Sequence, residues 1–359
     1  MKRILHIIGK MDRAGAETML MNLYRSIDRS KFQFDFVTFT TDKGDYDDEI
    51  IALGGQIIPI VAKDSVGRMV ELYRFLKIHP EYKIVHSHVL LNNAFQLTAA
   101  SLAGVKMRIS HSHNTSNGGK GTIHFAYEKL AKKAINRLAT HKIACGNEAK
   151  TYLYGDDDNV IILPNAVDVR AIQNTVNESK KNPQFDSNVI NIIQVARFMP
   201  VKNHAFVLDI AAALQAKQTN FVIHLVGDGQ LRTQIEEQVT NRKLTDHIKF
   251  WGLRTDVIEL MANADLMILP SLHEGFPVVL VESQAAGLSS LISDTVAKEV
   301  DLGLGLVEFL PIDNAELWAE RIKNFVKLNL SDEKIFKTLS HQGFDIHQNV
   351  IELQKLYES

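Results

Sequence analysis

Residues 3–26, RILHIIGKMDRAGAETMLMNLYRS, hold the pattern that decides the fold. Residues 3–8 form an apolar, β-branched run, residues 9–15 a turn-rich loop, and residues 17–26 place apolar side chains at helical spacing. A strand, a loop and an amphipathic helix follow one another in this order. The stretch therefore predicts the start of a parallel α/β sheet.

The same alternation continues along the chain. Further strands are expected in the first half at 32–39, 56–60, 84–88, 107–111 and 142–145, and in the second half at 189–195, 221–227, 248–251 and 266–269. Helices are expected between the strands, and two more begin at Pro277 and Asn314. The fold class is thus α/β, with two doubly wound parallel sheets.

The stretch between these two series differs in composition. Residues 164–188 are rich in Asn, Lys, Ser and Asp and have no sustained apolar period, which is typical of a linker. We therefore expect a first domain over 1–168, a linker over 169–188 and a second domain over 189–343. Two such domains would face each other across a cleft, where the carboxyl ends of their strands meet a ligand.

Composition narrows the class of protein. The chain has 359 residues, 45% hydrophobic and 23% charged, which suits two globular domains rather than a disordered or disulfide-held chain. Its single cysteine, Cys145, forms no intrachain disulfide and favours a reducing compartment. No apolar run reaches the roughly 18 residues of a membrane span, and residues 1–10 are too short for a signal peptide. A cytoplasmic protein is expected.

Charge is divided unevenly along the chain. Residues 1–181 hold 25 Lys and Arg against 19 Asp and Glu, whereas the remainder holds 15 against 23. The basic excess is strongest in segment 106–150, which predicts an anionic partner other than nucleic acid. Within it, residues 126–142 have helical period, with Leu130 on the apolar face and Lys129, Lys132, Lys133 and Arg137 on the other. This helix has two interpretations: a core helix with a solvated basic face, or peripheral contact with the inner face of the cell membrane.

The clearest local motif is Glu274-Gly275-Phe276-Pro277, with Glu282 following after seven intervening residues. A helix opening near Pro277 would leave backbone N–H groups free at Phe276, Val278 and Val279 to bind an anion. Two carboxylates flanking an anion site suit a nucleotide sugar, which has hydroxyls at both ends and phosphate between them. Alternatively, Glu274 interacts with the helix dipole and Glu282 is merely solvated.

Two cations follow the first strand of the second domain. Arg197 offers a planar fork and Lys202 a point charge, so both could neutralise one leaving diphosphate without a metal. The alternative is a pair of exposed surface cations.

Three glycine-bearing loops could complete the site. Gly227 and Gly229 follow one strand, Trp251 and Leu253 end another and could hold a base, and Gly15 opens the first helix. No strand is followed by a complete dinucleotide fingerprint, which argues against an NAD enzyme.

Histidines gather where two strands of the first domain end: His86, His88, His111 and His113. Because no cysteine or acid cluster accompanies them, no metal site is expected. We advance His113, and His111 after it, as groups that orient the transferred sugar; the alternative is a structural role for each.

In combination these residues resemble the retaining nucleotide-sugar glycosyltransferases of family four, which have the GT-B fold, and in particular enzymes of exopolysaccharide and capsule synthesis. The resemblance covers nearly the whole chain and rests on the following residues: Gly15, Glu17, Pro164, Asn165, Asp168, Arg197, Lys202, Gly227, Asp228, Gly229, Phe250, Gly252, the stretch 274–282 and Tyr357. Ala14 stands where the family often has a second glycine, and Ala166 where it has a glycine after Asn165.

The resemblance implies roles for individual residues. Arg197 and Lys202 would hold the donor diphosphate, Glu274 the donor sugar hydroxyls and Glu282 the ribose diol. Gly15 would approach the phosphate or the acceptor, His113 would lie beside the sugar, and the final helix, 344–359, would cross back onto the first domain. Candidates on the acceptor side are Glu17, His88 and His111.

The hypothesis is transfer of a sugar, with retention, from a nucleoside diphosphate sugar, expected to be uridine-linked, to a glycan or polyprenyl-diphosphate-linked acceptor. No cofactor or metal is expected. The proposed catalytic residues are His113, Arg197, Lys202 and Glu274, and the donor-binding residues are Gly15, Arg197, Lys202, Gly227, Gly229, Trp251, Leu253, Glu274, Gly275, Phe276, Pro277, Val278 and Glu282. Two alternatives remain: a GT-B-fold nucleotide-sugar epimerase and a non-catalytic GT-B subunit that binds a partner transferase.

Overall fold

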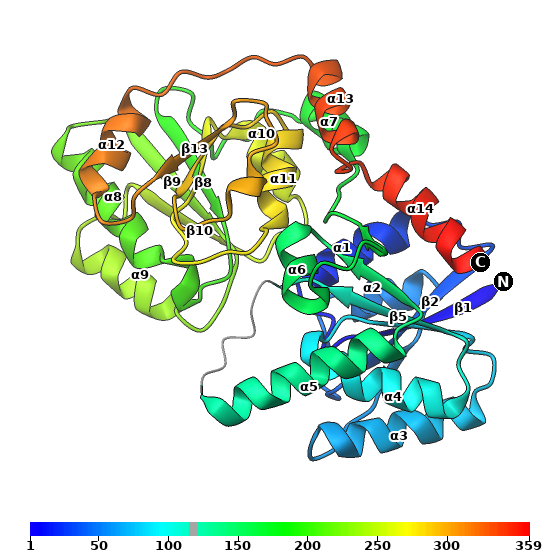
Figure 1. The fold of residues 1–359 in the computed structure, drawn as a ribbon. Helices are drawn as coiled ribbons and strands as arrows, with labels where there is room; N and C mark the ends of the chain where they lie inside the picture. The colour runs from blue at the N-terminus through cyan, green and yellow to red at the C-terminus, as the bar shows by residue number, and fades with distance from the viewer. Residues whose placement is uncertain (115–120) are drawn as a thin grey trace. The chain divides into compact units, whose positions relative to one another are not determined.

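The computed structural model describes residues 1–114 and 121–359 and divides the chain into two compact units (Figure 1). Unit 1 consists of Met1–Ala166 and Ile346–Ser359, and unit 2 of Val167–Asp345. Each unit is a parallel sheet covered by helices on both faces, so the predicted fold class is confirmed.

Unit 1 contains a seven-stranded sheet in the order β3-β2-β1-β4-β5-β6-β7. Its strands are β1 (Lys2–Ile7), β2 (Phe32–Thr38), β3 (Ile57–Pro59), β4 (Ile84–Ser87), β5 (Met107–Ser112), β6 (His141–Ala144) and β7 (Val160–Ile162). The strand order reverses between β1 and β4. This is the switch point at which doubly wound sheets bind ligands, because the loops after these two strands diverge.

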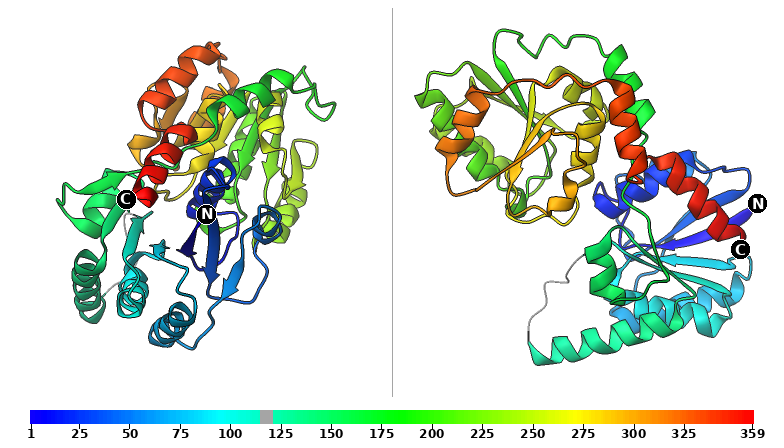
Figure 2. Two further views of the ribbon diagram at one scale, coloured as in Figure 1. Left: turned by 90° about the vertical axis from the view of Figure 1, so that its right-hand side faces the viewer. Right: turned by 45° about the horizontal axis from the view of Figure 1, so that its top comes forward.

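The helices of unit 1 are α1 (Gly15–Ser26), α2 (Asp47–Ala52), α3 (Ser65–Ile78), α4 (Asn93–Ala103), α5 (Thr122–Leu138), α6 (Asn147–Tyr154) and α14 (Ile346–Glu358), with a 3-10 turn at Leu90–Asn92. Helices α1 and α14 lie side by side on one face of the sheet, and α3 and α4 cover the other (Figures 1 and 2).

The C-terminal helix belongs to unit 1 because its buried side chains complete that core. Leu353 and Tyr357 of α14 are 2% and 0% exposed. The Tyr357 hydroxyl lies 2.8 Å from His86 Nδ1 on β4, and Asn349 Nδ2 donates to the Pro164 carbonyl at 2.8 Å. The last helix thus ties both ends of the chain to one sheet.

Unit 2 contains a six-stranded sheet in the order β10-β9-β8-β11-β12-β13. Its strands are β8 (Ile190–Val195), β9 (Phe221–Val226), β10 (Ile248–Gly252), β11 (Leu266–Leu269), β12 (Ser290–Ser293) and β13 (Val307–Leu310). All are parallel, and the order reverses between β8 and β11. The loops that carry Arg197 and Glu274 therefore follow the two strands at this switch point.

The helices of unit 2 are α7 (Val169–Glu178), α8 (His204–Ala216), α9 (Arg232–Asn241), α10 (Val257–Asn263), α11 (Val278–Ala285), α12 (Ala315–Lys323) and α13 (Asp332–His341), with 3-10 turns at Pro200–Lys202 and Lys298–Val300. Helices α8, α9 and α12 pack on one face, and α7, α10, α11 and α13 on the other. Trp318 of α12 is fully buried and donates its indole N–H to the Pro311 carbonyl at 2.8 Å.

The expected linker over 169–188 is wrong for its first half. Residues Val169–Glu178 form α7, whose Val169 and Ile172 are buried against α11 and α13. The Asp168 side chain caps this helix by accepting from the Ala171 N–H at 2.9 Å. The apolar residues of this helix, Val169, Ile172 and Val176, have helical spacing, but the polar residues between them hid the pattern in the sequence. The division between the units falls between residues 166 and 167 instead.

Strands β7, β12 and β13 and helix α13 were also not predicted from the sequence. The three strands have only three or four residues each, which is too short for alternation to distinguish them from a loop. Their place is decided by pairing with a longer neighbour, as β12 pairs with β11 through Met267 and Ser290.

Candidate functional site

An ion pair joins the two loops at the switch point of unit 2. Lys202 lies in the 3-10 turn after β8, Glu274 lies in the loop after β11, and the Lys202 Nζ contacts Glu274 Oε1. The two side chains are 19% and 14% exposed. Ser271 Oγ donates to the same carboxylate oxygen at 2.9 Å. The structure thus brings together two predicted site residues that are 72 positions apart.

Hydrogen bonds to backbone carbonyls hold these loops in place. The Leu272 N–H donates to the Val201 carbonyl at 2.8 Å, and Asn203 Nδ2 donates to the Pro270 carbonyl at 3.1 Å. Gln194 Nε2, on β8, donates to the Lys202 carbonyl at 3.1 Å. Because the loops are cross-linked to each other and to the sheet, the ammonium and the carboxylate are positioned before any ligand arrives.

The glycines of the third loop allow it to lie against the loop that carries Arg197. A Cβ at Gly227 would lie 2.1 Å from the Ala196 carbonyl oxygen, and one at Gly229 would lie 2.7 Å from the Phe198 carbonyl oxygen. Their φ angles, +138° and +153°, also favour glycine. The Phe198 N–H donates to the Asp228 carbonyl at 2.9 Å. The role visible for both glycines is this close approach of backbones.

The space next to the ion pair is open. Arg197 is exposed, and no partner for its guanidinium is found among residues 1–114 and 121–359. A Cβ at Gly275 would meet no atom within 4 Å. Helix α11 begins beyond it at Val278, and Pro277 precedes the helix as N-cap without a side-chain cap, so the first backbone N–H groups remain available. A cation, a helix N-terminus and room for a ligand therefore occur together.

Side chains of the 274–282 motif divide between site and core. Phe276 stacks on Phe344 with ring centroids 5.3 Å apart, and Val278 is buried, so these two residues can offer a ligand only their backbone. Glu282 is half-buried in the second turn of α11.

The indole N–H of Trp251 is engaged within unit 2, which limits how this residue could hold a base. Its Nε1–H donates to His224 Nδ1 at 3.0 Å, and Phe185 stacks on that imidazole with centroids 3.9 Å apart. Burial lowers the pKa of His224 to about 3, so the imidazole is a neutral acceptor. The indole is used inside unit 2, whereas Leu253 is 56% exposed and free to contact a ligand.

The predicted residues of unit 1 lie around its own switch point. His113, directly after β5, is half-buried, and its Nε2 lies 2.8 Å from His88 Nδ1. Burial lowers the pKa of His113 to about 3, so at neutral pH it is a hydrogen-bonding group and not a cation. His88 and His111 are 7% and 0% exposed, so their side chains offer little surface to an acceptor.

The loop before α1 is accessible. A Cβ at Gly15 would meet no atom within 4 Å, and Glu17 is half-buried in the first turn. Sequence reasoning missed His6 on β1, whose Nδ1 lies 3.1 Å from His88 Nε2, and Ser271. Both follow the pattern that did identify the others: a polar residue on or just after a strand beside a switch point.

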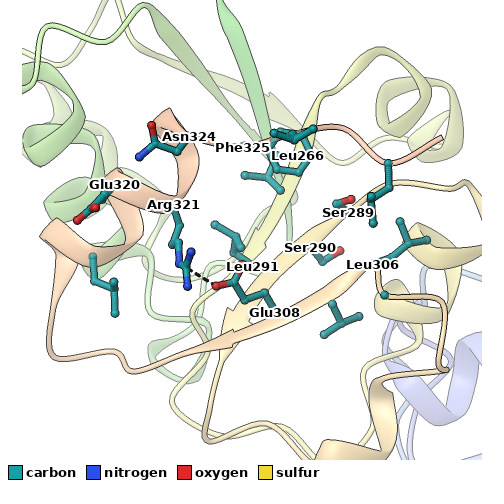
Figure 3. Close-up of a pocket in the computed structure, with 15 residues that line it drawn as sticks. Leu266, Ser289, Ser290, Leu291, Leu306, Glu308, Glu320, Arg321, Asn324 and Phe325 are labelled. Carbon is teal, nitrogen blue, oxygen red and sulfur yellow. Dashed lines mark ion pairs between the residues drawn. The ribbon is translucent and has the colours of Figure 1, made fainter.

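A hollow of about 560 Å³ lies elsewhere in unit 2 (Figure 3). It is lined by the first residues of β11, β12 and β13 and by α12, and Arg321 Nε pairs with Glu308 Oε1 across it at 2.9 Å. Because these are the amino ends of the strands, the hollow is at the opposite edge of the sheet from Lys202 and Glu274.

Helix α5 has most of the apolar face expected of it: Ala131 and Ile135 are buried, and Tyr127, Ala134 and Leu138 pack against the same core. Leu130, expected in the core, is 68% exposed, and Phe125 is 70% exposed. Both share an exposed surface with Lys129, Lys133 and Arg137. Residues 115–120 of the basic segment lie outside the described residues. Across the part of the chain that the structure describes, none of the helices combines the length and the apolarity needed to cross a bilayer.

Comparison with known proteins agrees with this architecture. Residues 13–171 match the family described as Glycosyltransferase Family 4, and residues 175–338 match Glycosyl transferases group 1. EpsF of Bacillus subtilis (strain 168), named as a glycosyltransferase, is 38% identical over 99% of this chain and 96% of its own. The capsular polysaccharide biosynthesis glycosyltransferase CapH of Staphylococcus aureus is 25% identical over 100% and 99% of the two chains.

Solved structures agree on the fold. HepE of Anabaena in complex with UDP superposes with a TM-score of 0.78 at 17% identity, covering 100% of both chains. The same protein in complex with UDP-glucose gives a TM-score of 0.74, covering 98% of this chain and 99% of HepE. With both units matched and a relative similar over its whole length, the chain belongs to the family 4 glycosyltransferases of the GT-B fold.

Proposed function

We propose that this chain transfers a sugar from a uridine diphosphate sugar to a lipid-linked glycan in exopolysaccharide or capsule synthesis. The observation that carries the proposal is the Lys202–Glu274 pair at the switch point of unit 2, beside the exposed Arg197. Solved HepE structures hold UDP and UDP-glucose, and an Escherichia coli relative, 26% identical over 80% of this chain, is named a UDP-Gal:alpha-D-GlcNAc-diphosphoundecaprenol galactosyltransferase.

In this proposal the donor binds to unit 2. Arg197 and Lys202 hold the diphosphate, helped by the backbone N–H groups of Gly275, Phe276 and Val278 around the start of α11. Glu274 accepts hydroxyls of the sugar through the oxygen that Lys202 and Ser271 do not use, and Glu282 accepts the ribose diol. Leu253 and the backbone around Gly227 and Gly229 border the base.

The chemistry proposed is retention of configuration without a metal on the diphosphate. The acceptor hydroxyl attacks the anomeric carbon on the face that the diphosphate leaves, and its proton passes to the departing phosphate oxygen. The bond between the acceptor oxygen and the anomeric carbon forms as the bond between that carbon and the phosphate oxygen breaks. No side-chain nucleophile is therefore needed. Arg197 and Lys202 stabilise the charge that develops on the leaving group. This stabilisation can lower the activation free energy by several kcal/mol.

The acceptor is assigned to unit 1. We retain His113 as the neutral imidazole that hydrogen-bonds the transferred sugar, with Gly15 and Glu17 as the open loop that admits the acceptor. His88 acts on His113 by hydrogen bonding rather than on the acceptor itself.

We further propose that α5 rests on the inner face of the cell membrane, where a lipid-linked acceptor is available. Its exposed surface combines two large apolar side chains, Phe125 and Leu130, with the cations Lys129, Lys133 and Arg137. Apolar residues can enter the headgroup region while the cations meet anionic lipids. Replacing Phe125 and Leu130 with Ser is expected to weaken binding to anionic vesicles while leaving UDP binding unchanged. Equal vesicle binding by this variant would refute the membrane contact.

The donor site is tested with Arg197→Ala and Lys202→Met. Each variant removes a charged hydrogen bond of about 1.5–3 kcal/mol, so calorimetry should show UDP binding weakened about 10–100-fold, and sugar transfer should fall at least as far. Arg321→Ala, which removes an exposed guanidinium at the opposite edge of the sheet, is the control and should change neither. Wild-type transfer by both site variants would refute the assignment.

Retention of configuration and independence of divalent cations are tested by separate measurements. Nuclear magnetic resonance of the product should show the anomeric configuration of the donor, and activity should survive a chelator that removes divalent cations. An isomerised nucleotide sugar formed from the donor alone would identify an epimerase instead.

A further inference from the structure

A column of five histidines runs through unit 1 on one face of its sheet. His6 on β1 is in register with His86 on β4, and His88, His111 and His113 continue the column toward the ends of β4 and β5. Neighbouring rings are close, with centroids 4.1 Å apart for His111 and His113 and 4.3 Å for His86 and His88. The sequence analysis expected no metal here because no cysteine or carboxylate accompanies the histidines, but it did not foresee that imidazoles alone would converge.

His111 is the member of the column that the fold leaves unsatisfied. Its side chain is fully buried, and among the described residues neither Nδ1 nor Nε2 has a hydrogen-bond partner. A buried polar group without a partner destabilises a fold by about 1–3 kcal/mol. Burial also lowers the pKa of His111 well below its usual value, so the ring is neutral and carries a lone pair. A neutral imidazole with an unused lone pair can coordinate a metal cation.

The three outer histidines have the spacing of a ligand set. One nitrogen from each of His88, His111 and His113 lies within 4.8 Å of the other two, and His88 Nδ1 is 2.8 Å from His113 Nε2. Tetrahedral zinc, with bonds of about 2.0–2.1 Å, requires its nitrogens about 3.4 Å apart. The His88–His113 separation is shorter than this value and the other separations do not exceed 4.8 Å, so local rotations of the rings would bring all three nitrogens to one ion.

The surroundings of His88 also suit a metal ligand. Its Nε2 lies 3.1 Å from His6 Nδ1, an outer hydrogen bond of the kind that fixes the tautomer of a ligating imidazole and leaves the other nitrogen for the metal. His113 is half-buried rather than enclosed, so an ion can enter from its side and keep a water as fourth ligand. The inner set, His6, His86 and His88, is fully buried, and His86 Nδ1 is already bonded to the Tyr357 hydroxyl.

We propose that His88, His111 and His113 form a binding site for a divalent transition metal of the zinc class. Three imidazoles without carboxylates select Zn²⁺, Co²⁺, Ni²⁺ or Cu²⁺ over Mg²⁺ and Ca²⁺. The bond between His88 and His113 gives way to metal coordination, and the shared proton moves to His113 Nδ1, which has no partner among the described residues. The site is separate in composition from Arg197 and Lys202 of unit 2.

A consequence follows that rests on the proposed function of His113. A metal bound to its Nε2 holds the imidazole against His88 and His111 and withdraws it from the sugar. Zn²⁺ therefore inhibits transfer, a chelator restores it, and UDP binding is unchanged because it uses unit 2.

The test uses the full chain without an affinity tag, stripped of metal by a chelator. Titration with ZnCl₂ in a calorimeter should show one ion bound per chain, and CoCl₂ should give the visible absorption of a low-coordinate imidazole complex. His113→Asn and His111→Gln should each weaken Zn²⁺ binding at least 10-fold. His79→Gln, at an exposed histidine of the same unit, is the control and should bind as wild type does.

The variants at His111 and His113 change the outer set of histidines and leave His6 and His86 of the inner set unchanged. His113→Asn changes a half-buried residue after the end of β5, and its near-ultraviolet circular dichroism should match that of wild type, which excludes unfolding as the cause of lost binding. No Zn²⁺ binding by wild type, or equal binding by His113→Asn, would overturn the site whatever the transfer activity. Zn²⁺ bound at the site without inhibition would leave the metal site standing and remove His113 from the reaction.

Discussion

Two glycine substitutions in unit 2 should have opposite effects on stability and on donor binding. In Gly227→Ala the new Cβ would lie 2.1 Å from the Ala196 carbonyl oxygen, so the two backbones must separate by about 1 Å. That movement weakens two hydrogen bonds, from the Ala196 N–H to the Val226 carbonyl and from the Gly227 N–H to the Gly252 carbonyl, both 2.9 Å. At about 1 kcal/mol each, with 1–3 kcal/mol for alanine at a φ of +138°, the loss is about 3–5 kcal/mol.

Gly275→Ala is the matched counterpart. No atom lies within 4 Å of its Cβ, and its φ is not in the left-handed range, so the free energy of unfolding should change by less than about 0.5 kcal/mol. Because we propose that the donor occupies this space, UDP-sugar binding should weaken at least 10-fold.

Thermal unfolding followed by circular dichroism, together with calorimetric titration of UDP-glucose, measures both quantities. For a unit of this size, 3–5 kcal/mol corresponds to a Tm lowered by about 10 °C. Unchanged unfolding of Gly227→Ala would refute the close-approach argument. Unchanged donor binding by Gly275→Ala, or a lowered Tm in that variant, would refute the assignment of the open space to the ligand.

Three further outcomes are expected. In a double-mutant cycle of Lys202→Met and Glu274→Gln, urea unfolding should give a coupling energy of about 1–3 kcal/mol, since each single change leaves a mostly buried charge unpaired; a coupling near zero would contradict the pair. Tyr357→Phe removes the hydroxyl bonded to buried His86 and should destabilise unit 1 by about 1–3 kcal/mol in the same assay. An unchanged urea midpoint would show that this hydrogen bond between α14 and His86 does not stabilise unit 1. Acid should also destabilise unit 1: burial lowers the pKa of His6 and His113 from 6.5 to about 3, so the unfolded chain takes up protons that the folded chain does not. Stability is then full above pH 6.5 and is lost as the pH falls toward 3, by about 1.4 kcal/mol per pH unit for each such histidine, and a urea midpoint constant from pH 7 to 5 would argue against it.

The prediction from sequence was accurate where one element carries the whole signal. Strand Leu266–Leu269 was placed at its observed ends, because its residues form one continuous apolar run. Helix α7 and strands β12 and β13 were missed because they are short or interrupted by polar residues, and their positions depend on neighbours far away in the chain.

Candidate residues divide in a similar way. Arg197, Lys202 and Glu274 lie after β8 and β11, as the sequence predicts, because the carboxyl ends of parallel strands meet at the same end of the sheet. Sequence alone does not show that the Trp251 indole N–H turns inward to His224. Leu130 was misassigned because helical period identifies an apolar face but not how far around the helix the neighbouring elements cover it.

The sequence by itself determined the parallel α/β class, the two series of strands and the loops that carry the candidate ligand-binding side chains. These properties depend on local periodicity and on glycine, proline and charge at strand ends. Only the tertiary structure decided that Lys202 meets Glu274 across 72 positions, that His6 meets His88 across 82, and that α14 closes the core of unit 1. The physical reason is that strand order in a sheet is chosen by the burial of both faces together, and no local pattern contains that choice.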